Sequence, residues 1–176
     1  MEIKGKKVAL LIERQYHTLE FWYPLLRMRE AGAEVIVVAP EAEKSFTSKV
    51  GYPAKSEKAA KDVNVDDIDA VIIPGGWAPD YMRRTPAIVK LVQKALEKGK
   101  VVAAICHAGW LLCSTGLLKG RKLTSFSSIK DDMENAGAIW SDEPCVIDDN
   151  LITSRTPDDL PYFTRAIVSS LSGSQE

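Results

Sequence analysis

The sequence has few of the residues from which metal centres and disulfide frameworks are built. Among 176 residues there are three cysteines and two histidines. The cysteines, Cys106, Cys113 and Cys145, stand at irregular spacing that matches neither a disulfide scaffold nor a zinc motif. We therefore expect no metal and no organic cofactor. Unpaired cysteines are typical of a reducing compartment, which predicts a cytoplasmic protein.

The sequence also lacks an excess of one charge and any long apolar segment. Its net charge is -1, with acids and bases mixed along the chain, so no basic face for nucleic acid is predicted. No apolar run approaches the ~18 residues that a membrane-spanning helix needs. The first seven residues contain no signal-peptide core. We expect a protein whose partners include neither nucleic acid nor a membrane.

What the chain does have is an alternation of strand and helix signals. Hydrophobic residues make up 45% of the chain, and its length suits one domain over residues 1–176. Apolar runs bounded by glycine and proline predict a strand, helix, strand order throughout. This order predicts an α/β fold, a doubly wound, mostly parallel sheet with helices on both faces. Strands are predicted at 8–12, 34–39, 70–73, 101–105 and 122–124, small hairpins at 49–55 and 146–153, and helices at 18–31, 86–98, 108–116, 129–136 and 157–171.

Cys106 stands at a corner between a strand and a helix. Val101 to Ile105 is an all-apolar run, and a helix is predicted from Ala108. A cysteine at this corner is lifted out of the sheet and meets the positive end of the helix, which favours the thiolate. Cys106 is therefore a candidate nucleophile, against the alternative of a small inert core residue. Cys113 and Cys145 are predicted to be inert core residues.

Two other segments are expected near Cys106, because ligand sites in such sheets lie at the carboxyl ends of the strands. Gly75 and Gly76 follow a buried strand, and their N–H groups could form an oxyanion hole with that of His107. An ordinary glycine-rich turn is the alternative. Glu20 stands four residues before Pro24, which has no N–H to donate to the Glu20 carbonyl. A carboxyl group there could reach the Cys106 sulfur and, when protonated, donate a hydrogen bond to it.

A set of short motifs is spread over nearly the whole chain. They are 20–24 (EFWYP), 31–35 (AGAEV), 73–80 (IPGGWAPD), 104–107 (AICH), 120–122 (GRK), 131–132 (DD), 135–138 (NAGA) and 151–157 (LITSRTP). Through these motifs the chain resembles the DJ-1/PfpI superfamily. The resemblance implies the flavodoxin-like, class I glutamine amidotransferase-like fold. It also implies Cys106 as nucleophile, Glu20 as its carboxyl partner, and Gly75 and Gly76 as the oxyanion loop.

The PfpI-type members that the chain most resembles are intracellular cysteine peptidases and their glyoxalase relatives. In the peptidase-like oligomers, a histidine after the nucleophile and an acid from a neighbouring subunit complete a triad. His107 and Asp80 fall at these positions, although relatives carry Glu at the second. The resemblance thus implies a homodimer or higher homo-oligomer. Neighbouring residues at a helix start project in different directions, so His107 need not face the sulfur.

Two further positions depart from the family pattern. His17 stands where relatives carry an acid, and Ala108-Gly109 follows His107 where relatives read Gly-Pro. The alternative for His17 is a surface histidine in a loop. Trp77 and Trp110 are expected to line the pocket, or else to lie in an interface or the core.

Together these features predict a cysteine-dependent enzyme that acts on a carbonyl group. The first expectation is a cofactor-independent, glyoxalase-like conversion of small 2-oxoaldehydes to hydroxy acids through a Cys106 thiohemiacetal. The second is a peptidase or amidase that uses a Cys106-His107-Asp80 triad between subunits and takes a peptide as substrate. The third is a redox-sensing stress protein or chaperone in which Glu20 holds an oxidised Cys106.

Overall fold

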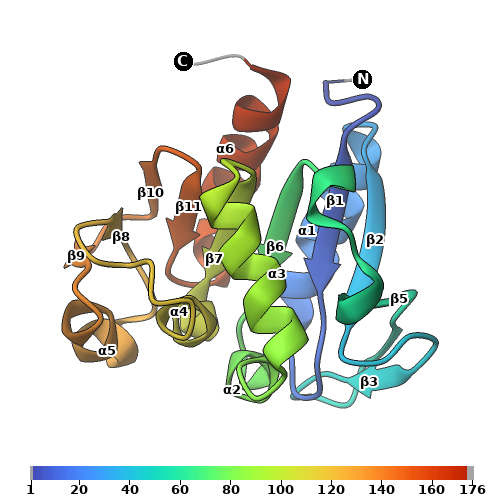
Figure 1. Ribbon diagram of the computed structural model, residues 1–176, viewed down its shortest axis with the longest axis horizontal. Helices are drawn as coiled ribbons and strands as arrows, with labels where there is room; N and C mark the ends of the chain where they lie inside the picture. The colour runs from blue at the N-terminus through green and yellow to red at the C-terminus, as the bar shows by residue number, and fades with distance from the viewer. Residues whose placement is uncertain (1, 174–176) are drawn as a thin grey trace.

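Seven strands form the central sheet of the computed structural model, which describes residues 2–173 (Figure 1). Every neighbouring pair in the sheet is parallel except the pair at one edge, β10 and β11. The mostly parallel, doubly wound fold predicted from the sequence is thereby confirmed. In sheet order the strands are β10 (Cys145–Asp148), β11 (Leu151–Ser154), β7 (Val101–Ile105), β6 (Ala70–Ile73), β1 (Lys7–Leu11), β2 (Glu34–Ala39) and β5 (Lys58–Ala59).

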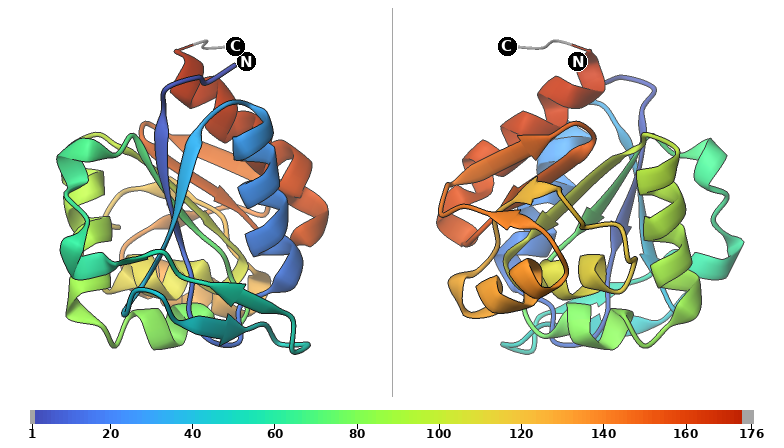
Figure 2. Two further views of the ribbon diagram at one scale, coloured as in Figure 1. Left: turned by 90° about the vertical axis from the view of Figure 1, so that its right-hand side faces the viewer. Right: turned by 60° about the vertical axis from the view of Figure 1, so that its left-hand side comes forward.

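Helices cover both faces of this sheet (Figure 2). The helices α1 (Thr18–Glu30) and α6 (Leu160–Ser172) pack on one face, and α3 (Pro86–Glu97) packs on the other. The central strands are buried from both sides, which explains why β6 reads as an unbroken apolar run. Three short helices complete the fold. In chain order, α2 (Ala78–Met82) follows β6, α4 (Gly109–Cys113) follows β7, and α5 (Lys130–Asn135) comes after both. None of the helices within residues 2–173 is long and apolar enough to cross a membrane.

The order of the strands reverses at β1, because the chain passes from β1 to β2 on one side and later places β6 on the other. Such a switch point leaves a crevice at the carboxyl ends of the two strands. In Figure 1 these ends lie at the bottom of the view, beside α2 and β3, whereas both termini lie at the top. The loop after β1, the Gly75-Gly76 turn after β6 and Cys106 after β7 therefore meet at one edge of the sheet.

A small hairpin, β3 (Ser45–Thr47) and β4 (Pro53–Lys55), is bound to the loop after β1. The N–H of Gln15 donates to the carbonyl of Thr47 at 2.7 Å, and the N–H of Lys49 donates to the carbonyl of Tyr16 at 3.0 Å. The predicted hairpin at 49–55 is thus present, but it starts earlier and its first strand precedes Lys49. The hairpin tip is held at the edge of the crevice.

Several elements differ from the sequence prediction. The helix α2 and the two-residue strands β5 and β9 (Ile139–Trp140), the latter paired with β8 (Lys122–Leu123), were not predicted. The segment after Cys106 is a 3₁₀ turn over Cys106–Ala108 followed by α4, and α4 ends before the predicted limit at Gly116. Short 3₁₀ turns also begin α5 and α6, at Ser127–Ile129 and Pro157–Asp159. Propensity identifies long amphipathic segments well, but two- to five-residue elements depend on tertiary contacts.

Candidate active site

Cys106 forms a sharp corner at the end of β7. Its φ angle is 62°, in the left-handed region that residues other than glycine rarely adopt. Such a conformation costs on the order of 1–3 kcal/mol and persists where the surrounding structure enforces it. The corner directs the side chain out of the sheet, where the N–H groups of His107 and Gly76 approach the sulfur. The side chain is nevertheless buried, with 7% exposed.

Glu20 reaches the same place from the first turn of α1. It is fully buried, and its Oε2 accepts a 2.8 Å hydrogen bond from the Gly75 N–H. Its carboxyl group lies beside Cys106, since Glu20 Oε2 and Cys106 Cβ both flank Gly75 and the two side chains interact electrostatically. Burial raises the pKa of Glu20 from 4.5 to about 7. Its Oε1 has no partner that meets hydrogen-bond geometry among the residues described. The α1 helix continues through Pro24 to its end at Glu30.

The two glycines after β6 permit this close approach. A Cβ at Gly75 would lie 2.5 Å from Glu20 Oε2 and 2.7 Å from Cys106 Cβ, so any side chain there would separate the pair. Gly76 has a φ of 76°, and its Cβ would collide with the backbone of Gln15 at 2.5 Å. Because the Gly75 N–H donates its hydrogen bond to Glu20, the donors near the sulfur are the N–H groups of Gly76 and His107. This differs from the expectation that Gly75 also serves as an oxyanion donor.

The pKa of the Cys106 thiol is shifted upward, in the direction opposite to the thiolate that the sequence predicts. Burial first, and then the charge of Glu20, raise the pKa of Cys106 to about 12, and the two backbone N–H groups lower it by less. The helix dipole contributes little, because a 3₁₀ turn follows Cys106 and α4 is only five residues long. Cys106 is therefore a thiol at neutral pH, and its ionisation requires a base beside it. The other two cysteines, Cys113 and Cys145, are free and half-buried.

His107 faces the sulfur, contrary to the concern that its position on the helix start would turn it away. Its Nδ1 lies 3.2 Å from Cys106 Sγ, because both residues belong to the same tight 3₁₀ turn. Its Nε2 lies 3.3 Å from the Oγ of Ser128, a residue that the sequence analysis missed. Burial, followed by the charge of Lys49, lowers the pKa of His107, so the ring is neutral and one nitrogen can accept a proton.

Three aromatic rings surround the His107 imidazole. Phe126 stacks on it with a centroid separation of 5.0 Å, and the rings of Trp110 and Trp77 lie 4.9 Å and 5.4 Å away. Both tryptophans thus line the site as expected, and Trp110 is fixed by a 2.9 Å hydrogen bond to Asp132. They also line an open cleft of about 350 Å³ with Gln15, Asp80 and Tyr81.

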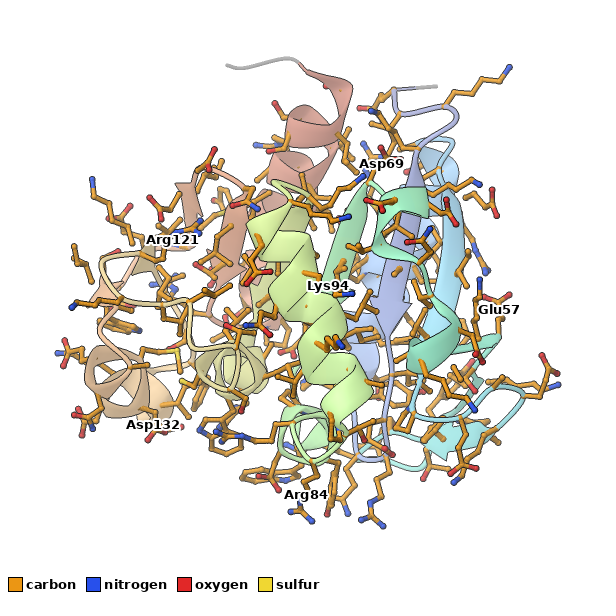
Figure 3. The ribbon with its side chains drawn as sticks, viewed as in Figure 1. Glu57, Asp69, Arg84, Lys94, Arg121 and Asp132 are labelled. Carbon is orange, nitrogen blue, oxygen red and sulfur yellow. The ribbon has the colours of Figure 1, made fainter. Side chains whose placement is uncertain are left out.

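Asp80 does not contact His107 within this chain. It lies in α2 and forms an ion pair with Arg84 one helical turn later. In Figure 3, Arg84 is labelled at the lower edge of the molecule, at the end that carries the site. The partner of His107 Nε2 inside the chain is Ser128 instead. If Asp80 forms part of a triad, it must therefore pair with His107 of a second subunit.

His17 and Lys49 lie around the mouth of the site. His17 precedes α1, its N–H donates to the Gly75 carbonyl at 3.1 Å, and its buried Nδ1 has no partner among residues 2–173. Lys49, at the hairpin tip, exerts its charge on His17, Glu20 and His107 alike. No sequence motif singles out Lys49, because only the hairpin's attachment to the loop after β1 brings it to the site. No cluster of three metal-ligating side chains occurs in the described part of the chain.

The family model of the DJ-1/PfpI family matches residues 6–170. The chain belongs to the DJ-1/PfpI family. It is 41% identical to protein/nucleic acid deglycase 2 of Escherichia coli, over 92% of this chain and 95% of that protein. It is 40% identical to deglycase PfpI of Pyrococcus furiosus, over 94% of this chain and 99% of the other.

A solved structure extends this comparison to the fold. A two-domain protein from Anabaena variabilis, which contains DJ-1/ThiJ/PfpI-like and ferritin-like domains, superposes with a TM-score of 0.93 at 45% identity. The match covers 95% of this chain and 48% of that one. The flavodoxin-like, class I glutamine amidotransferase-like fold implied by the sequence resemblance is thus confirmed.

Proposed function

We propose that this protein is a cysteine-dependent enzyme that converts small 2-oxoaldehydes to hydroxy acids through a thiohemiacetal on Cys106. The observation that carries the proposal is a buried thiol flanked by two bases, Glu20 and the His107 ring 3.2 Å away. The deglycase names of relatives at about 40% identity support chemistry on aldehyde-derived groups. The three free cysteines are compatible with a reducing cytoplasm, where we place the reaction.

The first step is addition of the sulfur to the aldehyde carbon. With a pKa of about 7, Glu20 is partly ionised at neutral pH, and its unpartnered Oε1 is free to take the thiol proton. As the S–C bond forms, the carbonyl π electrons move to oxygen, and the N–H groups of Gly76 and His107 stabilise that oxyanion. Glu20 then returns the proton, which gives the neutral thiohemiacetal.

The second stage moves a hydrogen from C1 to C2. Neutral His107 accepts the C1 proton at Nδ1, which gives an enediolate. His107 then returns that proton to C2 as the proton of the C1 hydroxyl passes to the C2 oxygen, which gives a thioester. Water then hydrolyses the thioester, which releases the hydroxy acid and restores the thiol. No electrons leave the substrate, so the isomerisation needs no external oxidant or reductant.

Methylglyoxal consumption with lactate formation, followed by proton NMR, tests the proposal. We expect turnover in the wild type, loss of turnover in Cys106→Ser and retention in Cys113→Ser, the matched control for a cysteine outside the site. In D₂O, deuterium should enter at C2 of the lactate if the C1 proton passes through an exchangeable base. Undiminished turnover in Cys106→Ser would contradict the proposal.

Hydrolysis of peptides or amides is the second candidate. It is favoured by the His107 Nδ1 position, which suits a base for the sulfur and an acid for an amine leaving group. In an oligomer, Asp80 of a neighbouring subunit would complete that relay, at the cost of its pairing with Arg84. Cys106-dependent cleavage of fluorogenic peptides, with methylglyoxal untouched, would select this candidate instead.

A further inference from the structure

Lys49 is held at the mouth of the site by its backbone. Its N–H donates to the Tyr16 carbonyl at 3.0 Å, and Tyr16 and Ser48 form an isolated parallel bridge. The turn beyond Lys49 is closed by the Ser48 hydroxyl, which accepts from the N–H groups of Val50 and Tyr52 at 3.3 Å and 3.0 Å. The position of Lys49 is therefore set by the same loop that carries His17.

The ammonium group of Lys49 points toward the reactive residues. Its Nζ lies 5.6 Å from the centroid of the Trp77 ring, which in turn lies 5.4 Å from the His107 ring. Its charge acts on His17 and Glu20 at the start of α1 and on His107 in the turn after β7. A cation in this place lies within electrostatic reach of the residues around the sulfur.

This cation has no carboxylate partner among the described residues, unlike its neighbours in the hairpin. Lys44 pairs with Glu41 at 2.8 Å, and Lys55 pairs with Glu43. No ion pair of Lys49 occurs within residues 2–173. The family resemblance implies an acid at the position of His17, and burial together with the Lys49 charge keeps this histidine neutral by lowering its pKa. The mouth of the site thus carries a cation that no ion pair among the described residues neutralises.

We propose that Lys49 binds a carboxylate on the substrate, so that the site favours short aldehydes that carry a carboxylate group near the reacting carbonyl. This inference rests on the proposed function for the identity of the electrophile. An ammonium is a compact charge with three donors, and it attracts a carboxylate without requiring a fixed approach. The partly exposed Trp77 ring lies beneath the lysine head and fixes its place beside the crevice.

The decisive experiment compares two alkylating reagents of similar size, iodoacetate and iodoacetamide. Mass spectrometry of the Cys106 peptide gives both rates, and their ratio reports attraction of an anion to the site. Any effect of a variant on the ionisation of Cys106 cancels in this ratio, because both reagents attack the same thiolate. In Lys49→Gln, we expect the ratio of the iodoacetate rate to the iodoacetamide rate to fall about fivefold. This is the effect of losing the attraction between two unit charges about 4 Å apart in water.

Two control variants fix the interpretation. Lys55→Gln removes the same charge from the same hairpin, but its ammonium pairs with Glu43, and its ratio should equal that of the wild type. Lys49→Arg keeps the charge and should retain most of the wild-type ratio. Raising the salt to 0.5 M should reduce the wild-type ratio toward that of Lys49→Gln. An unchanged ratio in Lys49→Gln, or an equal fall in Lys55→Gln, would overturn the proposal.

A second measurement uses aldehydes directly. Glyoxylate and the neutral glycolaldehyde should each protect Cys106 from iodoacetamide by reversible addition to its sulfur. In Lys49→Gln, the glyoxylate concentration for half-protection should rise about fivefold, while that for glycolaldehyde stays the same. Equal changes for both aldehydes would show that Lys49 acts on the thiol rather than on the anion. Neither experiment requires turnover, so absence of glyoxalase activity would refute the proposed function without touching this inference.

Discussion

Replacing Glu20 by glutamine should stabilise the protein at alkaline pH while it abolishes turnover. Glutamine has nearly the same shape, and its oxygen can still accept the 2.8 Å hydrogen bond from the Gly75 N–H. It carries no charge, however, whereas the wild-type carboxyl is fully buried and must ionise there above neutral pH. The substitution therefore removes a cost that the active site imposes on the fold.

The magnitude follows from the pKa of Glu20, raised from 4.5 to about 7. The native state binds this proton more tightly than the unfolded state, so the free energy of unfolding falls as the pH rises from 4.5 through 7. At 1.36 kcal/mol for each pH unit, the total loss is about 3 kcal/mol. Glu20→Gln should thus gain about 3 kcal/mol over the wild type at pH 8 and less than about 1 kcal/mol at pH 5.

Urea unfolding at the two pH values measures this difference. By thermal unfolding, the same gain at pH 8 corresponds to a melting temperature higher by roughly 6–12 °C. Glu97→Gln is the matched control, because Glu97 is an exposed glutamate at the end of α3 and its substitution should give no such pH-dependent gain. A Glu20→Gln protein that is no more stable than the wild type at pH 8 would refute the account of a costly buried carboxylate.

Three further predictions concern the reaction and its geometry. The kcat/KM for methylglyoxal should rise with pH around an apparent pKa of about 7, the pKa of Glu20, and Glu20→Gln should lose this rise with the activity. Gly75→Ala should lower kcat at least tenfold, because its Cβ would overlap Glu20 Oε2 and Cys106 Cβ; wild-type kinetics would contradict the packing argument. Ser128→Ala should lower kcat a few-fold and leave KM unchanged, because Ser128 orients His107 through Nε2, and Ser128→Thr should restore activity.

The sheet and its long helices were predictable because their hydrophobic patterns depend on local sequence. The four buried strands β1, β2, β6 and β7 appear within one residue of the predicted limits. The short elements α2, β5 and β9 were missed, because they exist only where other parts of the chain hold them. Their segments carry no apolar run or hydrophobic period long enough to be recognised.

At the site, the sequence identified the residues that approach the sulfur but not how they act on it. The corner at Cys106 and the glycines after β6 are visible in the sequence because they follow apolar runs. The upward shift of the Cys106 pKa is not visible in the sequence, because it depends on burial and on the carboxyl group of Glu20, 86 residues away in the chain. Ser128 and Lys49 were missed for the same reason, since each reaches the site from a loop that carries no motif.

The raised pKa values at the centre of the site argue for ionisation that accompanies substrate addition rather than a resting thiolate. A thiol with a pKa of about 12 is almost wholly protonated at neutral pH, and peroxide oxidises the thiolate rather than the thiol. The sulfur becomes nucleophilic when Glu20, with a pKa of about 7, takes its proton as the S–C bond forms. That coupling is what the proposed addition of the sulfur to an aldehyde requires. It also explains why the fold maintains a strained cysteine and a buried carboxyl side by side: each alone would only destabilise the protein, and together they exchange one proton.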